Sequence, residues 1–234
     1  MSTTESFSEL MDKPEWYTDA QTYWNGVTPT IDGMLGGLSV VDPVDVKGSL
    51  EFVHEFVHGK EPVITNQYAC DCGAGIGRVT KNFLLQVPFD KVDLIEQAPS
   101  FVEQAKSSYL KHEIEKGQIG QILCQGLQDF APEQGKYDLI WCQWVLGHLT
   151  DDHFVAFFKR CIQGLKPNGL IGVKENTASK EALFDEEDSS ITRPNEALKS
   201  LFEQAGLEVI KEEVQKGFPQ GLFPVRMYML RKKK

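Results

Sequence analysis

One short segment, CDCGAGIGRVT, carries glycines at alternate positions, Gly73, Gly75 and Gly77, with Asp71 just before them and Arg78 just after. Glycine allows the backbone to approach a ligand closely and to adopt φ angles that other residues avoid. A short apolar run precedes this loop and a helical pattern follows it, which is where open α/β sheets bind their ligands. The segment therefore predicts a nucleotide-type site. The alternative is a tight turn that binds nothing.

The spacing of the glycines separates the possible cofactors. The dinucleotide fingerprint is G-x-G-x-x-G, whereas here the third glycine comes one residue earlier and Arg78 follows it. No P-loop lysine pattern is present. The next apolar run, KVDLIE, ends at Glu96, at the distance where a carboxylate can bind ribose hydroxyls. The loop resembles the first motif of the S-adenosylmethionine-dependent methyltransferases, so we expect S-adenosylmethionine as cofactor and S-adenosylhomocysteine as product.

A second segment, YDLIWCQWVLGHLTDDH, combines aromatic and polar residues in an unusual way. Trp141 and Trp144 stand on either side of Gln143, and His148 follows. An ordinary buried strand would need neither Gln143 nor His148. Each residue alone also allows a structural interpretation: Trp144, like Trp24, could be a core aromatic, and His148 could be a hydrogen-bonded residue at a helix start.

Short apolar runs alternate with helical patterns from residue 66 onward. Seven runs are typical of strands: 67–72, 91–96, 119–125, 137–143, 169–176, 207–215 and 224–230. Four segments are typical of helices: 77–87, 98–116, 151–165 and 194–206. This alternation predicts an α/β fold with a doubly wound, mostly parallel, seven-stranded Rossmann-like sheet. No helix separates the last two strands, so we expect them to pair antiparallel. Asp151 or Asp152 is expected to cap the third helix.

The first 60 residues follow a different pattern. PEWYTDAQTYWNGV and SLEFVHEFVH have the apolar spacing of helices, and glycines and a proline interrupt regular structure between them. The chain has 234 residues, of which 41% are hydrophobic, enough for one well-packed domain with an extension. We expect a helical extension over 1–60 that packs on a methyltransferase domain over 61–234.

Several motifs together resemble the eukaryotic protein N-terminal methyltransferases. These motifs are TYWNGVTPTIDGMLGG, DCGAGIGRVTK, GLQDF, the segment around Trp144, LKPNG, VKEN and DEEDSSITR, and they extend from about Trp16 to about Arg231. Members of that family methylate the α-amine of proteins whose exposed N-terminus reads X-Pro-Lys or similar. The resemblance implies transfer of one to three methyl groups. The rival functions are methylation of a small-molecule amine or other metabolite, non-catalytic recognition of N-termini, and, less compatible with the glycine spacing, a dehydrogenase.

The resemblance also assigns the cofactor contacts. It implies that Gly73 and Arg78 hold the methionine part, with the forked guanidinium of Arg78 on the cofactor's carboxylate. Glu96 corresponds to the ribose-binding acid, where animal enzymes typically carry aspartate. The remaining implied contacts are Leu127 and Gln128 around the adenine and Gln143 on the amino-acid side.

A separate set of residues matches the peptide channel of that family: Trp24, Leu35, Trp144, Asn176, Asp185, Asp188 and Ser190. The resemblance implies that Trp144 stacks on the substrate proline and that Asn176 binds peptide backbone. Asp185 would receive the lysine side chain with help from Ser190, and the glycine-rich DGMLGG would cover the channel. Without the resemblance, the acidic run from Asp185 to Asp188 reads as a solvated loop.

Catalysis requires a neutral α-amine, whose unperturbed pKa is about 8. A base must remove its proton, and the matched candidates are Asp188 first and His148 second. The sequence departs from the family near the C-terminus, where a glutamate and a tyrosine are usual and Gly221, Leu222 and Phe223 stand instead. This departure predicts weaker selection for lysine at that end of the channel.

Charge and composition exclude other classes. The net charge of −10 argues against nonspecific binding of nucleic acid and is compatible with a cationic substrate or with solubility alone. The apolar runs are too short for a membrane span, and the N-terminal segment lacks the features of a secretory signal. We therefore expect no membrane or direct nucleic-acid partner.

The cysteines give no sign of a disulfide framework or a metal site. The count is odd, and the one close pair, C-x-C, has no second pair to complete a zinc site. We expect buried reduced thiols at Cys70, Cys72, Cys124, Cys142 and Cys161. These thiols predict an intracellular location, in the cytosol, the nucleus or both; the C-terminal RKKK reads as a solvated end or a weak nuclear signal.

Overall fold

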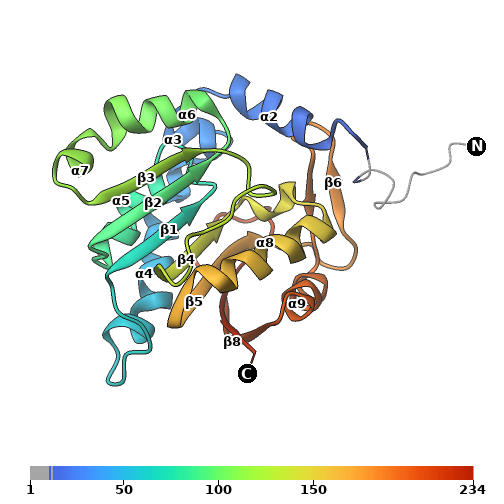
Figure 1. Cartoon of the computed structure of the whole chain (residues 1–234). Helices are drawn as coiled ribbons and strands as arrows, with labels where there is room; N and C mark the ends of the chain where they lie inside the picture. Colours follow the sequence, from blue (N-terminus) through green and yellow to red (C-terminus); the bar gives the residue numbers. More distant parts are fainter. Residues whose placement is uncertain (1–10, 12, 234) are drawn as a thin grey trace, which may run out of the picture.

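A seven-stranded sheet forms the centre of the molecule (Figure 1). The structure is a computed structural model that describes residues 11 and 13–233. The strand order is β3-β2-β1-β4-β5-β9-β8, and only β9 runs antiparallel to its neighbours. This arrangement confirms the predicted fold, including the antiparallel pairing of the last two strands. The strands are β1 (Tyr68–Cys72), β2 (Lys91–Glu96), β3 (Ile119–Cys124), β4 (Tyr137–Gln143), β5 (Leu165–Asn176), β8 (Leu207–Val214) and β9 (Val225–Lys232).

The strand order changes direction between β1 and β4. β1 pairs in parallel with β2 on one side and with β4 on the other, so the connections that leave these two strands diverge. Open α/β sheets bind ligands in the crevice outside the carboxyl ends of such strands. The glycine loop follows β1 and Trp144 follows β4, which places both sequence motifs at this crevice.

Helices cover both faces of the sheet. One face packs against α4 (Asp42–His58) and α5 (Arg78–Asn82), and the other against α8 (Asp151–Gly164) and α9 (Asn195–Gln204). Figure 1 shows α8 and α9 on the same side of the sheet. The other α-helices in the described residues are α2 (Trp16–Gly26), α3 (Ile31–Met34), α6 (Pro99–Gln104) and α7 (Lys111–Glu115).

Alternation along the central strands decides which polar side chains meet α4. In β4, Trp141 belongs to the core cluster on the α4 side and Cys142 to the cluster on the α8 side. Successive residues of a strand point to opposite faces, so Gln143 falls on the α4 side. In β5, Val173 lies in the α8 cluster, which places Lys174 on the α4 side. Two polar residues therefore face the first turns of α4.

The N-terminal helix α2 bridges two distant parts of the molecule. Near one end, the ring of Trp16 stacks on Phe184 at 5.7 Å, and near the other, Trp24 meets Phe101 of α6 at 6.2 Å. Phe184 belongs to a hairpin of β6 (Leu183–Asp185) and β7 (Ser190–Thr192). Figure 1 shows α2 between α6 and this hairpin. The predicted division of the chain at residue 60 stays a prediction, and residues 1–10 and 12 lie outside the described residues.

The structure differs from the sequence-based expectations at several element boundaries. The helix expected over 98–116 is interrupted by a π turn, Ala105–Tyr109, and the one expected over 77–87 ends as an α-helix at Asn82. The N-cap of α8 is Thr150, not Asp151 or Asp152, because Thr150 has extended φ/ψ and its hydroxyl accepts the N–H of His153 at 3.3 Å. The β6–β7 hairpin replaces the loop expected around the acidic run.

The cysteine expectations hold with one exception. All five thiols are free, and Cys70, Cys72, Cys142 and Cys161 are buried, but Cys124 at the end of β3 is exposed. None of the helices in the described part of the chain combines the length and apolar character that crossing a membrane requires.

Candidate active site

Two cavities meet at the carboxyl edge of the sheet. The first, which we call the glycine-loop cavity, encloses about 860 Å³ including its open mouth and is lined by residues that follow β1, β2, β3 and β4. The second, the hairpin cavity, encloses about 990 Å³ on the same basis and is lined by residues of β7 and the segments before β9. The two cavities share lining residues Trp24, Met34, Leu35, Trp144 and His148. Two bound ligands would therefore lie on either side of these shared residues.

The glycine-loop cavity brings together every residue that was predicted to bind the cofactor. Its lining includes Gly73, Arg78, Glu96, Leu127, Gln128 and Gln143. These residues lie at or after the carboxyl ends of four different strands, so the fold itself assembles them.

The glycine loop requires glycine at its first two positions. Gly73 and Gly75 have φ angles of 73° and 56°, in the left-handed region. A Cβ atom on Gly73 would lie 2.5 Å from Cγ2 of Val145, and one on Gly75 would lie 2.1 Å from Sδ of Met34. The backbone N–H of Gly73 also donates to the carbonyl of Ile95 at 2.8 Å. The loop is therefore fixed close to the residues that follow β2 and β4.

Glu96 holds the glycine loop as well as facing the cavity. Its Oε2 accepts the N–H of Gly75 and its Oε1 accepts the N–H of Ala98, both at 2.8 Å. Burial raises the pKa of Glu96, and these backbone donors act in the opposite direction. Each oxygen keeps a further lone pair, so the carboxylate can still accept hydrogen bonds from a ligand.

Arg78 has two protein partners that the sequence did not reveal. Its Nη1 donates to Asp42 and to Asp45, both at 2.7 Å. The expectation named only the carboxylate of the cofactor as its partner. Burial would lower the pKa of Arg78, but the two aspartates raise it. The available signal was weak: two acids three residues apart at the start of an amphipathic helix.

Two residues with strained backbone lie at the hairpin cavity: Trp144 in its lining, and Ser189 between the lining residues Asp188 and Ser190. Trp144 and Ser189 both have φ of 52°, which is uncommon for residues with a Cβ atom. The N–H of Trp144 donates to the carbonyl of Lys174 at 3.0 Å, which holds this conformation. Backbone strain of this kind clusters at functional sites. The indole N–H of Trp144 is buried and has no hydrogen-bond partner among the described residues.

His148 and Asp188 face each other across the second cavity. Nε2 of His148 lies 4.0 Å from Oδ2 of Asp188 and accepts the indole N–H of Trp24 at 3.0 Å. Nδ1 lies 3.4 Å from the carbonyl of Ser189, so the ring is neutral with its proton on Nδ1. Burial lowers the pKa of His148, and the Asp188 charge acts in the opposite direction. Oδ1 of Asp188 is buried without a partner among the described residues.

The remaining predicted substrate residues divide into two groups. Asn176 and Ser190 line the hairpin cavity, whereas Asp185 does not. Asp185 is exposed on β6, opposite Ser190, and its Oδ1 accepts the N–H of Glu187 at 2.9 Å. Its place next to the cavity-lining residue Ser190 comes from a hairpin that the sequence did not predict.

The segment where the sequence departs from the family, near the C-terminus, also lies at the hairpin cavity. Leu222 and Phe223 line the hairpin cavity and are 38% and 43% exposed. Gly221 is exposed and has φ of 92°.

Comparison with known proteins decides the family. Residues 12–231 match the family described as AdoMet dependent proline di-methyltransferase. A relative from Dictyostelium discoideum, alpha N-terminal protein methyltransferase 1, is 48% identical over 228 residues, which cover 97% of this chain and 82% of that protein. This chain is a member of that methyltransferase family.

Two further matches agree with this family. A relative from Xenopus tropicalis, N-terminal Xaa-Pro-Lys N-methyltransferase 1, is 44% identical over 221 residues, which cover 94% of this chain and 97% of that protein. A solved structure from Leishmania major, described as a SAM-dependent methyltransferase, has a TM-score of 0.84 at 41% identity and covers 95% of this chain and 86% of that one. The resemblance found in the sequence is thus confirmed.

The glycine-loop cavity of the methyltransferase fits S-adenosylmethionine. The glycines leave a cradle that a Cβ atom would fill, and the lining combines an acid, a guanidinium and the apolar side chain of Leu127. Within the described residues, the hydrogen bonds of Arg78 all come from Nη1, which leaves Nε and Nη2 for a ligand carboxylate. The same lining offers the polar groups of Glu96 and Gln128.

Two residues of the methyltransferase site escaped the sequence analysis. Met34 lines both cavities, and its Sδ lies 3.2 Å from the N–H of Ile76, so it rests on the glycine loop. Glu175 lines the hairpin cavity, and its Oε1 accepts the N–H groups of Val145 and Leu146, both at 2.8 Å. Both residues stand inside motifs quoted above, Met34 in DGMLGG and Glu175 in VKEN, but the resemblance assigned neither of them a role of its own.

Proposed function

We propose that the enzyme transfers methyl groups from S-adenosylmethionine to the N-terminal α-amine of proteins that begin Xaa-Pro-Lys. Membership of the family and the printed names of the relatives support this substrate class. The observation that carries the proposal is the buried Oδ1 of Asp188, which has no hydrogen-bond partner among the described residues and lies in a cavity that shares lining residues with the cofactor cavity. An α-ammonium is a donor of the right charge for that oxygen.

The residues of the hairpin cavity prepare the amine. When bound, S-adenosylmethionine supplies an electrophilic methyl group carried on a sulfonium. Asp188 accepts a proton from the α-ammonium, so that an N–H bond breaks and its electron pair remains on nitrogen as a lone pair. His148 is neutral in this arrangement because its Nε2 accepts the indole N–H of Trp24, and burial lowers its pKa in the same sense. It therefore adds no positive charge beside the cationic substrate.

Trp144 explains a requirement for proline at the second position. Proline has a fixed φ and no amide donor, so it presents the first residue of the peptide in one direction. The half-buried ring of Trp144 lines both cavities and offers a flat apolar surface for the pyrrolidine. Asn176, on the same cavity wall, can bind the peptide backbone.

Selection of the third residue is expected to be loose. Acidic residues of the β6–β7 turn stand on one side of the cavity mouth, with Asp185 exposed among them. Leu222 and Phe223 stand at the same mouth and carry no charge. The acidic residues should favour lysine as the third substrate residue. Leu222 and Phe223 should also allow an apolar residue at that position.

The number of methyl groups is part of the proposal. A secondary or tertiary amine keeps a lone pair after deprotonation, so the same arrangement can act again, from one methyl group up to three. We further propose that the enzyme acts in the cytosol, the nucleus or both, since its five cysteines are free thiols.

A peptide panel tests the proposal. The purified enzyme is incubated with S-adenosylmethionine and one of three peptides: Ser-Pro-Lys-Arg, the same peptide with an acetylated α-amine, and Ser-Ala-Lys-Arg. Whole-peptide mass should increase by methyl steps for the first peptide, remain unchanged for the second, and increase far less for the third. Methylation of small amines with no methylation of any peptide would instead identify a metabolite methyltransferase.

A further inference from the structure

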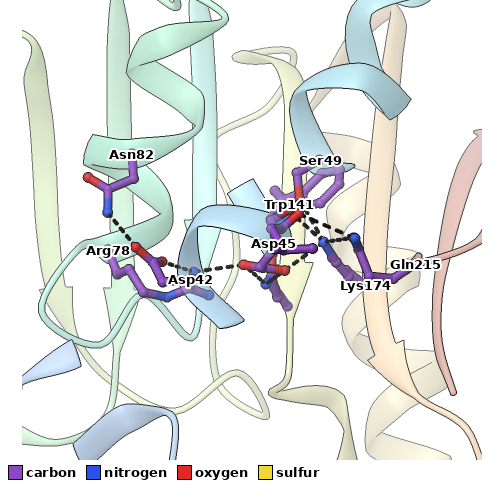
Figure 2. Close-up of polar contacts among 10 residues, drawn as sticks. Asp42, Asp45, Ser49, Arg78, Asn82, Trp141, Lys174 and Gln215 are labelled. Carbon is purple, nitrogen blue, oxygen red and sulfur yellow. Dashed lines mark hydrogen bonds and ion pairs between the residues drawn. The ribbon is translucent and has the colours of Figure 1, made fainter. Parts of the chain in front are cut away.

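Asp45 is the centre of a buried polar network beneath α4. Its side chain is 2% exposed, and its carboxylate accepts hydrogen bonds from Nη1 of Arg78 at 2.7 Å and from Nε2 of Gln143 at 2.9 and 2.8 Å. Nζ of Lys174 completes the set at 2.6 Å. Figure 2 shows Asp45 between Arg78 on one side and Lys174 on the other. Arg78 and Gln143 line the glycine-loop cavity, and Lys174 does not.

Lys174 is fully buried in the middle of the sheet. Its side chain has 0% exposure, and Nζ also donates to the carbonyl of Asp45 at 2.9 Å, to Ser49 at 3.0 Å and to Gln215 at 2.7 Å. Burial lowers the pKa of Lys174, and Asp45 acts in the opposite direction. A buried ion pair is often no more stabilising than well-packed apolar residues. The pair therefore needs a reason beyond stability.

We propose that Asp45 and Lys174 are positioning residues for the amino-acid end of the cofactor. Asp45 fixes Arg78 and Gln143 at the cavity wall, and Lys174 balances the charge of Asp45, so that the network carries no net negative charge against the cofactor's carboxylate. This inference rests on the proposed function only in that the glycine-loop cavity binds S-adenosylmethionine.

The charges of the network support this division of labour. Two carboxylates, Asp42 and Asp45, meet two cations, Arg78 and Lys174, so the four charges cancel. Without Lys174, both aspartates would pair with one guanidinium. The network would then have a negative net charge before a ligand binds. A ligand carboxylate would then add a third negative charge beside a single cation. A ligand that lacks this carboxylate would meet no such repulsion.

The test compares two ligands that differ at this end. S-adenosylhomocysteine carries the amino-acid group, whereas 5′-methylthioadenosine keeps the adenosine and sulfur but lacks it. In Lys174→Met, calorimetry should show the dissociation constant of S-adenosylhomocysteine raised about tenfold or more, as expected for loss of a charge-assisted contact. Binding of 5′-methylthioadenosine should change by less than about twofold. In kinetics, KM for S-adenosylmethionine should rise while KM for the peptide stays unchanged.

Two further variants separate positioning from folding. The double variant Asp45→Asn, Lys174→Met removes one charge of each sign and should recover most of the affinity for S-adenosylhomocysteine. Lys211→Met is the matched control, because Lys211 also ties the sheet to α4, through Glu55 at 2.6 Å and the carbonyl of Phe52 at 3.1 Å, but lies outside the cavity lining. Lys211→Met should leave both ligands unaffected.

Other outcomes would overturn the inference. If Lys174→Met binds both ligands more weakly by the same factor, Lys174 has a general structural role. If it binds both as tightly as the wild type, Lys174 has no role in binding. If the double variant binds S-adenosylhomocysteine as weakly as Lys174→Met does, the proposed charge balance is contradicted. Wild-type enzyme that binds S-adenosylhomocysteine but methylates no peptide would refute the proposed function alone and leave this inference standing.

Discussion

Trp24 donates its indole N–H to Nε2 of His148 at 3.0 Å, and this contact fixes the state of the histidine. The nitrogen that faces Asp188 is therefore an acceptor and carries no proton. Trp16, on the same helix, donates to the backbone carbonyl of His148 at 2.7 Å. Helix α2 thus holds both the position and the tautomer of His148. Because the indole N–H already occupies the lone pair of Nε2, the proposed function assigns proton acceptance to Asp188.

Removal of the Trp24 indole should raise the pKa of His148. A donor on Nε2 stabilises the neutral ring, so Trp24→Phe favours the protonated form. In the wild type, burial already lowers this pKa from 6.5, so His148 should titrate below that value. Histidine NMR titration of Trp24→Phe should show an upward shift. Trp16→Phe is the control, since its indole bonds only the carbonyl; an equal shift in both variants would contradict the assignment.

Asp188→Asn should remove catalysis without removing the cofactor. Asparagine keeps the shape of the side chain but cannot accept the proton, so kcat with Ser-Pro-Lys-Arg should fall about 100-fold or more. Calorimetry with S-adenosylhomocysteine should give an unchanged dissociation constant, because Asp188 lines only the hairpin cavity. Activity within a few-fold of wild type would show that Asp188 is not the base.

Gly73→Ala should weaken both folding and cofactor binding. Alanine at this φ costs roughly 1–2 kcal/mol, and its Cβ would lie 2.5 Å from Val145 in addition. Gly117→Ala is the matched control, because Gly117 has φ of 72° with nothing within 4 Å of its Cβ position. Thermal melts should show a larger loss of stability for Gly73→Ala, and only this variant should lose affinity for S-adenosylhomocysteine. Equal behaviour of the two would refute the proposed cradle.

Glu175 should make the enzyme less stable as pH rises. Burial raises its pKa from 4.5 to about 7, and the N–H groups of Leu146 and Val145 act in the opposite direction. The folded state therefore binds the proton more tightly than the unfolded state. This contribution to stability is present below pH 4.5 and is lost as pH rises through about 7. One pKa step is worth about 1.4 kcal/mol, so the loss reaches about 3 kcal/mol at most.

Urea unfolding at several pH values measures this effect. Glu175→Gln keeps an oxygen for Val145 and Leu146 but cannot ionise, so the decline in unfolding free energy between pH 5 and pH 8 should be smaller. Asp71, whose pKa burial raises to about 6, accounts for part of the remaining slope. A glutamine at Glu51, whose side chain is 69% exposed, serves as control. An identical slope in wild type and Glu175→Gln would rule out the raised pKa.

The sequence predicted most of the sheet because its signals are local. Alternating apolar runs and helical periods identify the seven strands, and the missing helix before β9 predicts its antiparallel direction. The hairpin of β6 and β7 has three residues in each strand, too few for a periodic pattern. The cap of α8 was misassigned because Thr150 and the two aspartates after it are all good caps, and only the backbone angles distinguish them.

The cofactor residues could be named from motifs, but their protein partners could not. Asp42 and Asp45 meet Arg78 only because α4 packs across the sheet, a contact between segments more than 30 residues apart. The unusual φ of Trp144 likewise comes from the hydrogen bond to Lys174 on the neighbouring strand. Packing between distant elements determines these features, and no local pattern encodes it.

The position of the transferred methyl group is the most direct test of methylation at the N-terminal α-amine. After incubation of the enzyme with S-adenosylmethionine and Ser-Pro-Lys-Arg, tandem mass spectrometry of the product assigns the added mass to the α-nitrogen or to the lysine side chain. The proposed function predicts methyl groups on the α-nitrogen of the first residue and none on lysine. Methyl groups on the lysine side chain, or an unmodified peptide in the presence of bound cofactor, would contradict it.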